Sequence, residues 1–376
     1  MKKTVCMVLC ACMLALPVGA LADEPVIETD AKSVLLMEQS TGNVLYEKNA
    51  DEQLPIASVT KIMTMLLIME ELDRGTITLD DMVSVSENAM SYGGSTMFLE
   101  AGEQLSINDM LKGIAVASAN DGCAAMAEHL AGSEAAFVER MNKRAGELGM
   151  NNTHFMNTNG LDAENHYSSA RDVAIMSREL IKHEKIFNYT SIWTDELRQG
   201  KFKLANTNKL VRFYDGANGL KTGSTSKALC CLSAAAKRDG MQLIAVVLGA
   251  PTSAKRFSSA RALLDYGFAA YKINVLAQKD EEAGTVKVNK GVNDDVTAVC
   301  ANEYSELVKR NEADSAERRI TLDESVDAPV KAGQKIGTME FIRGGSVTGS
   351  IDLTASRDVE KKGLSGIIKD FLKMLV

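Results

Sequence analysis

The segment KIMTMLLIMEEL, residues 61–72, constrains the fold more than any other part of this sequence. Its apolar residues lie on nearly every side of a helix, rather than along one stripe. Such a helix is stable in water only when other elements surround it, so we expect a buried central helix. From about residue 56 to residue 187 the hydrophobic period is that of a helix, whereas before and after this region it is two, as in strands.

Strand-like segments flank this helical region. Residues 33–50 alternate around a central turn and predict a hairpin, and residues 229–237 and 241–250 alternate in the same way. The simplest assembly is one antiparallel sheet, with the intervening helices as a second lobe and a helix over 260–271 packing on the sheet. We therefore predict an α/β domain of the α+β type, with its site in the crevice between the lobes.

Beyond residue 273 the sequence changes character. Short alternating segments with regularly spaced turns predict a small all-β domain over 274–358. Residues 359–376 place apolar side chains at helical spacing, with lysines on the other surface. This amphipathic helix suits an anionic membrane surface, and packing against the β domain is the alternative.

The first 22 residues have the form of a secretory signal peptide. Lys2 and Lys3 precede an apolar run, and Ala20-Leu21-Ala22 is a small-residue cleavage site. The run is shorter than the roughly 20 apolar residues that a membrane crossing needs, so a cleaved signal is favoured over a single-span anchor. We expect an exported, extracytoplasmic protein whose first domain spans 23–273.

Composition and motif content argue against several classes of protein. The formal net charge of −8 speaks against nucleic-acid binding, which depends on clustered lysine and arginine. The sequence contains no H-E-x-x-H, no G-x-S-x-G and no cysteine or histidine spacing typical of zinc sites. We therefore expect no metal and no cofactor. Beyond the signal peptide the cysteines are too few for a disulfide framework: Cys123, Cys230, Cys231 and Cys300.

Ser58 and Lys61 form an S-x-x-K motif at the start of the apolar helix. Residues three apart share a helix face, with Cβ atoms about 5 to 6 Å apart, so the amine can reach the hydroxyl proton. At a helix N-terminus the serine also has free backbone N–H groups beside it. An apolar environment disfavours the charged form of lysine, so we expect a neutral amine that can act as a base.

Two further motifs follow in the chain. Ser118-Ala119-Asn120 is an S-x-N between helices, and Lys221-Thr222-Gly223 lies in NGLKTGST, a predicted strand whose glycines leave the backbone accessible. Each motif alone is frequent by chance, and the serines would then be read as ordinary helix caps. Their arrangement is more specific: a serine on a buried helix start, an S-x-N between helices, and a cation on a later strand.

The order S-x-x-K, S-x-N, K-T-G resembles that of penicillin-binding proteins and serine β-lactamases. The similarity extends to ASANDGC, NTNGLDAENHYSSARDVA and DGMQLIAVVLGA, and covers about residues 30–270. The chain is most similar to low-molecular-weight D-alanyl-D-alanine carboxypeptidases. This resemblance implies a β-lactamase/transpeptidase-like catalytic domain, followed by a second domain and a membrane anchor. It also implies an enzyme that removes the terminal D-alanine from peptidoglycan stem pentapeptides and is acylated by β-lactams.

The resemblance implies a role for each motif residue. Ser58 would be the nucleophile, and Lys61 its general base. Ser118 would pass a proton to the leaving amine, and Asn120 would orient the substrate amide. Lys221 would receive the terminal carboxylate, and its positive potential would favour a neutral Lys61. The other substrate-binding residues are expected to be Thr222, Gly223, Ser224, whose N–H joins that of Ser58 in an oxyanion hole, and Arg256, which supports the carboxylate end.

Two other functions are open at this point. A class A β-lactamase shares the acylation residues but needs a glutamate that activates the deacylating water. Glu147 and Asn151 fit an E-x-x-x-N pattern, yet Glu147 is predicted at the end of a helix rather than in a loop over the site. A catalytically silent cell-wall binding module is the second alternative, and the intact S-x-x-K motif argues against it.

Overall fold

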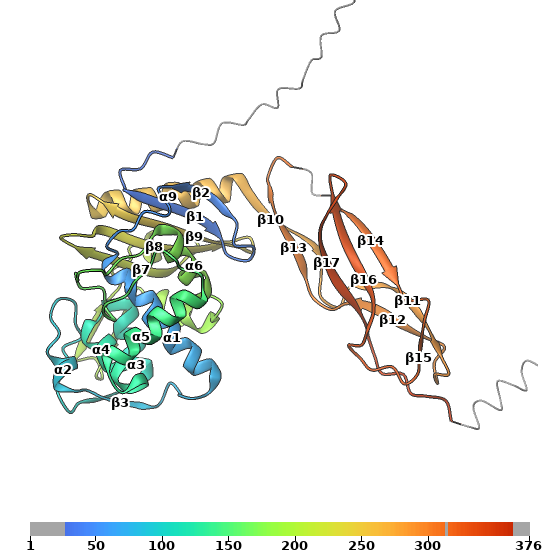
Figure 1. The fold of residues 1–376 in the computed structure, drawn as a ribbon, viewed down its shortest axis with the longest axis horizontal. Coiled ribbons are helices and arrows are strands. Elements are labelled where there is room, and N and C mark those ends of the chain that lie inside the picture. Colours follow the sequence, from blue (N-terminus) through green and yellow to red (C-terminus); the bar gives the residue numbers. More distant parts are fainter. Residues whose placement is uncertain (1–26, 313–314, 364–376) are drawn as a thin grey trace, which may run out of the picture.

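The computed structural model describes residues 27–312 and 315–363. The predicted signal peptide and nearly all of the predicted terminal helix lie outside these residues. Within them, a five-stranded antiparallel sheet and a lobe of helices form the first domain, and an all-β domain follows it (Figure 1). The predicted α+β architecture with a small β domain is confirmed.

The large sheet has the strand order β2-β1-β9-β8-β7. Its strands are β1 (Ser33–Glu38), β2 (Val44–Lys48), β7 (Ala217–Thr225), β8 (Leu229–Arg238) and β9 (Met241–Ala250). Every residue of β9 is buried, because α6 (Ala170–Leu180) packs on one face of the sheet and α9 (Ser253–Ala270) on the other. The predicted hairpin and later strands are therefore confirmed, and the predicted helix over 260–271 begins earlier, at Ser253.

The remaining helices between β2 and β7 form the second lobe. They are η1 (Ala57–Thr60), α1 (Lys61–Arg74), α2 (Glu87–Met90), α3 (Ile107–Lys112), the π-helical turn η2 (Gly113–Ala117), α4 (Asn120–Ala131), α5 (Glu134–Glu147), η3 (Glu184–Ile186), α7 (Phe187–Thr190) and α8 (Leu210–Phe213). Two short two-stranded sheets that the hydrophobic period did not indicate interrupt them: β3 (Met82–Ser84) with β4 (Gln104–Ser106), and β5 (Thr194–Leu197) with β6 (Phe202–Ala205).

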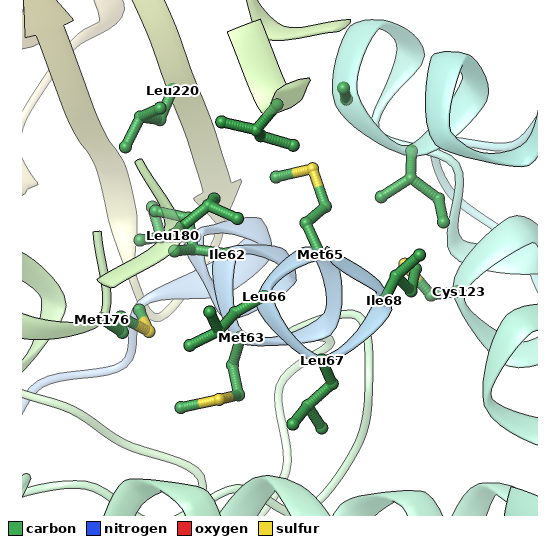
Figure 2. Packing of buried hydrophobic residues seen from close by; sticks show 14 of the residues in the cluster. Ile62, Met63, Met65, Leu66, Leu67, Ile68, Cys123, Met176, Leu180 and Leu220 are labelled. Atoms are coloured by element: carbon green, nitrogen blue, oxygen red, sulfur yellow. The ribbon is translucent and has the colours of Figure 1, made fainter. Parts of the chain in front are cut away.

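Helix α1 lies at the centre of this lobe, as its composition predicts. Residues 61–69 are all buried. Figure 2 shows its apolar side chains pointing outward on several sides, with Met176 of α6 and Cys123 of α4 among their neighbours. Each fully buried side chain of this kind contributes about 1.5–3 kcal/mol, so the surrounding elements fix the position of the helix. The helix stops at Gly75, which takes a left-handed conformation with φ 70°.

The second domain has its own hydrophobic core around a six-stranded sheet of order β14-β16-β17-β12-β11-β15. The strands are β11 (Glu282–Asn289), β12 (Asp295–Cys300), β14 (Glu317–Leu322), β15 (Ser325–Asp327), β16 (Lys335–Arg343) and β17 (Ser346–Ala355). A ribbon of β10 (Tyr271–Ala277) and β13 (Tyr304–Lys309) joins the domains and spans the predicted boundary at residue 273.

The predicted start of the terminal helix, at residue 359, is wrong. Val359 forms a β-bridge with Val330, and Lys361 forms one with Gly291. Backbone pairing with the β domain therefore holds this stretch extended. In the part of the chain that the structure covers, no helix combines the length and apolar character that a membrane crossing requires.

Candidate active site

Ser58 and Lys61 lie where the sheet meets the helical lobe, because η1 packs against β7 and leads into α1. Ser58 belongs to the 3-10 turn η1, which leads into α1, so the nucleophile candidate precedes the α-helix rather than belonging to it. The Lys61 side chain is fully buried, and its Nζ lies 2.9 Å from the Ser58 Oγ. This distance permits direct proton transfer between the two groups.

Two carbonyl oxygens complete the surroundings of the Lys61 amine. The Nζ lies 2.7 Å from Asn120 Oδ1 and 2.6 Å from the backbone oxygen of Asn159. A neutral amine has two N–H donors and one lone pair, and a carbonyl oxygen can only accept. When Lys61 is neutral, the two carbonyls therefore take its two hydrogens, and the lone pair faces the Ser58 hydroxyl. This arrangement orients the lone pair of Lys61 so that the amine can act as a base towards Ser58.

Burial favours the neutral form of the Lys61 amine. It lowers the pKa of Lys61 from the ordinary 10.5 to about 8, against the opposing effect of the Asp121 carboxylate. Burial also lowers the pKa of Lys221, and the nearby Lys61 charge lowers it further. The Cys123 thiol is neutral, because burial raises its pKa to about 12. The charge on Lys61 thus disfavours a second charge on Lys221 inside one buried region.

Strand β7 brings the K-T-G motif against the serine. A Cβ atom on Gly223 would lie 2.7 Å from the Ile56 oxygen and 2.9 Å from the Ser58 nitrogen, so glycine is required for this approach. Two residues earlier, Lys221 is fully buried and donates to the backbone oxygen of Thr222 at 2.9 Å. The predicted pairing of a helix-borne serine with a strand-borne lysine in one place is therefore present.

β7 is an edge strand among the described residues, and half of its outer edge is covered. Asn208 donates to the backbone oxygen of Gly219 at 2.8 Å, and Thr190 donates to that of Asn218 at 2.7 Å. These side chains occupy the part of the edge that precedes Lys221. Among the described residues no strand pairs with the edge from Lys221 onward, so an extended ligand could add there as a further strand.

Asn120 of the S-x-N motif contacts the Lys61 amine, and Ser118 is buried two residues before it. Ser118 takes a left-handed conformation with φ 64° between η2 and α4. The side chain of Asn120 links α1 to the loop after α2, because its Oδ1 contacts Lys61 and its Nδ2 donates to the Gly93 oxygen at 2.8 Å. Neither residue caps α4, whose N-terminus has no side-chain cap. The motif therefore does not serve the structural purpose that we considered as its alternative.

Asp121, which the sequence analysis did not single out, supports this wall of the site. Its buried carboxylate accepts hydrogen bonds from the backbone N–H groups of Met97 and Leu99, at 3.1 and 3.0 Å. The same loop provides the oxygen that receives the Asn120 amide. The only feature of the sequence that could have indicated Asp121 is its position directly after Asn120.

A loop over residues 156–166 holds the second carbonyl in place. Gly160 has φ 87°, and a Cβ atom there would lie 1.9 Å from the Ala57 oxygen. The ring of His166 accepts from the Met156 N–H at its Nδ1, so its Nε2 carries the proton and donates to Thr60 Oγ1 at 2.8 Å. Burial lowers the pKa of His166 to about 4, which keeps this link neutral.

The remaining predicted residues lie around β7. Arg256, on α9, donates to the backbone oxygens of Gly223 at 3.2 Å and Cys231 at 3.4 Å, so it braces the strand from the α9 side. Thr222 lies 2.6 Å from the hydroxyl of Thr207. Ser224 follows on the exposed side of the strand. In the described ranges, no cluster of histidine, cysteine or carboxylate side chains could hold a metal ion.

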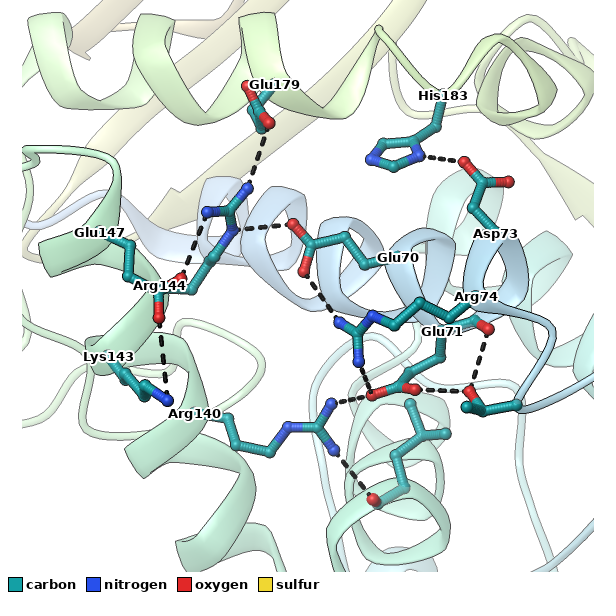
Figure 3. Close-up of polar contacts among 12 residues, drawn as sticks. Glu70, Glu71, Asp73, Arg74, Arg140, Lys143, Arg144, Glu147, Glu179 and His183 are labelled. Carbon is teal, nitrogen blue, oxygen red and sulfur yellow. Dashed lines mark hydrogen bonds and ion pairs between the residues drawn. The ribbon is translucent and has the colours of Figure 1, made fainter.

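Glu147, the possible lactamase glutamate, lies elsewhere. It ends α5, where it pairs with Arg144 and Lys143 in an ion-pair network (Figure 3). Arg144 also bonds Glu70, which is nine residues and about 13 Å along α1 from the catalytic lysine candidate. Glu147 is therefore not placed to activate a water at Ser58.

The fold and site together define a serine acyl-transfer enzyme of the transpeptidase-like class, with a lysine beside its nucleophile candidate. Residues 20–252 match the D-alanyl-D-alanine carboxypeptidase family (peptidase S11), and residues 271–361 match the C-terminal domain of penicillin-binding protein 5. The chain belongs to the D-alanyl-D-alanine carboxypeptidase family.

Individual relatives agree with this family. The chain is 45% identical over 344 residues to the D-alanyl-D-alanine carboxypeptidase DacF of Bacillus subtilis, covering 90% of this chain and 88% of that protein. It is similar to the crystal structure of penicillin-binding protein 5 from Haemophilus influenzae, with a TM-score of 0.71, 32% identity and coverage of 89% and 98%. Penicillin-binding protein D2 from Listeria monocytogenes, solved in an ampicillin-bound form, is 32% identical with a TM-score of 0.60, over 65% of this chain and 100% of that chain.

Proposed function

We propose that Ser58 of this carboxypeptidase attacks the peptide bond between the last two residues of peptidoglycan stem peptides ending in D-Ala-D-Ala. The single observation that carries the proposal is the Lys61 amine held between the Ser58 hydroxyl and two carbonyl oxygens. Neutral Lys61 takes the proton of Ser58 Oγ, and the oxygen forms a bond to the penultimate D-alanine carbonyl carbon. The backbone N–H groups of Ser58 and Ser224 stabilise the resulting oxyanion.

Collapse of the tetrahedral intermediate breaks the C–N bond. The proton held by Lys61 passes through Ser118 to the leaving amine, and D-alanine departs. A water then attacks the ester, its proton returns by Lys61, and the shortened peptide leaves while Ser58 regains its hydroxyl hydrogen. Asn120 orients the substrate amide, Lys221 and Thr222 bind the terminal carboxylate, and Arg256 stabilises the strand through the Gly223 carbonyl.

A β-lactam acylates Ser58 in the same way, but the resulting ester is hydrolysed more slowly. Ring opening gives an ester on Ser58 without a separate leaving group. Near the Lys61 amine, the structure places the Asn159 backbone carbonyl, which is not basic enough to activate a water as a carboxylate does. We therefore propose a long-lived penicillin adduct, which distinguishes this protein from a β-lactamase.

We further propose that the protein acts outside the cytoplasm. Residues 1–22 would be a cleaved signal peptide, 23–273 the catalytic domain and 274–358 the β domain. An amphipathic helix beyond residue 363 would bind the outer face of the cytoplasmic membrane. Co-sedimentation with anionic vesicles of the full chain and of a variant truncated after residue 363 tests the last point, and equal binding would contradict it.

Release of D-alanine from a pentapeptide ending in D-Ala-D-Ala tests the proposed activity. Intact-mass measurement after incubation with penicillin tests the nucleophile. Ser58→Ala removes both signals while the protein stays folded. Ser133→Ala is a matched control, because it removes a hydroxyl that caps α5 and costs about 1 kcal/mol without touching the site. No adduct on the wild type would support a silent module, and rapid penicillin turnover would support a β-lactamase.

A further inference from the structure

One carboxylate stands at the open end of the substrate-binding strand. Asp162 Oδ1 accepts a hydrogen bond from Thr225 Oγ1 at 2.7 Å, and Thr225 is the last residue of β7. Asp162 is exposed, and across the described residues no lysine, arginine or histidine forms an ion pair with it. Its negative charge is therefore available to a ligand that lies along the strand.

The carboxylate is held by two separate elements. On the loop side, Asn157 Oδ1 accepts from the Gly160 N–H at 2.7 Å, and Asn159 Oδ1 accepts from the Leu161 N–H at 3.0 Å. These local turns stiffen the chain just before Asp162. On the strand side, Thr225 fixes one carboxylate oxygen. The position of the charge is thus set relative to both Ser58 and β7.

The order of residues along β7 indicates which substrate residue lies near Asp162. This step rests on the proposed function, in which Lys221 binds the terminal carboxylate and Ser58 attacks beside Gly223. Successive residues of a strand are about 3.3 Å apart, so an extended substrate that runs antiparallel to β7, with its penultimate D-alanine opposite Gly223, places the residue before its two D-alanines opposite Ser224. The side chain of that residue needs to span only about one further residue spacing to reach Thr225 and Asp162.

We propose that Asp162 binds a cationic side chain at the residue that precedes D-Ala-D-Ala. The ligand chemistry is that of a diamino acid with a free ammonium group on a flexible side chain. Such a chain can reach the second carboxylate oxygen while the first keeps its bond to Thr225. Asp162 would then be a specificity-determining residue, separate from the acylation residues.

Two tripeptides that differ by one charge test the proposal on the full chain. Nα-acetyl-L-Lys-D-Ala-D-Ala keeps its side-chain ammonium, and the Nα,Nε-diacetyl peptide lacks it. The ratio of their kcat/KM values for D-alanine release reports recognition of the charge. Because exposed ion pairs are weak, we expect the wild type to prefer the charged peptide by about two- to fivefold at low ionic strength. Added salt should reduce this preference.

Asp162→Asn should bring the ratio to about one, whereas Glu164→Gln, on the same exposed loop, should keep it. A wild-type ratio of one, or an unchanged ratio in Asp162→Asn, overturns the proposal. Equal loss on both peptides in Asp162→Asn also overturns it, because the residue then acts on the structure alone. Failure of the proposed function is a distinct result: the wild type would release D-alanine from neither peptide and form no penicillin adduct.

Discussion

Acylation of Ser58 should depend on pH through the Lys61 amine. Burial of this amine lowers its pKa to about 8, which corresponds to about 3 kcal/mol against the charged form. The neutral fraction is then about one tenth at pH 7 and about one hundredth at pH 6. If neutral Lys61 is the base, the second-order rate constant for acylation should rise about tenfold per pH unit below pH 8 and level off above it.

The assay is the rate of penicillin adduct formation from pH 5.5 to 9.5, followed by intact mass. Because Lys221 shares the buried region, the measured midpoint belongs to the pair of lysines. Asp121→Asn should move the midpoint to lower pH, since the Asp121 charge raises the pKa of Lys61. Ser133→Ala should leave the profile unchanged. A flat profile between pH 6 and 9, or a midpoint near 10.5, would refute the assignment of Lys61 as a neutral base.

Four other outcomes follow from the same structure. The unfolding free energy of the wild type relative to Lys61→Met should rise by about 3 kcal/mol from pH 7 to 10.5, because the unfolded chain keeps a proton that folded Lys61 loses; denaturant titrations measure this. Relative to His166→Gln, the wild type should lose about 3 kcal/mol as the pH falls from 6.5 to 4, because the folded ring resists protonation. Gly160→Ala should slow acylation by tenfold or more, whereas Gly149→Ala, with φ 73° but open space around it, should strain the chain without slowing acylation. Glu147→Gln should leave penicillin turnover unchanged and cost less than about 1 kcal/mol, since its ion pairs are partly exposed.

The sequence predicts the parts of this fold that depend on side-chain patterning. An apolar surface all round residues 61–72 can only be satisfied at the centre of a lobe, and α1 lies there. Alternation over 229–237 and 241–250 predicts strands that share a sheet with the first hairpin: β9 pairs with β1, and β8 pairs with β9. The three motifs then fall on a helix start, a helix junction and a strand, and their order is the one that the family resemblance associates with a single site.

The parts that sequence could not predict depend on backbone groups and on long-range packing. Asn159 contacts the Lys61 amine through its main-chain carbonyl, a group that every residue type possesses. The neighbouring Gly160 is the only sequence feature that could have indicated this contact. Strands of three or four residues, such as β3 and β4, are too short to establish a period. The stretch around Val359 reads as the start of an amphipathic helix, but pairing with Val330 overrides this local preference.

The covered first half of the β7 edge limits what length of chain can continue past the site. A peptide that extends beyond its residue at Lys221 would meet the hydrogen bonds that Asn208 and Thr190 make to Gly219 and Asn218. Side chains thus occupy the carbonyls of Gly219 and Asn218, whereas among the described residues no strand pairs with the edge that follows them. Architecture alone accordingly favours trimming a single residue from a free end over cutting within a strand of polymer.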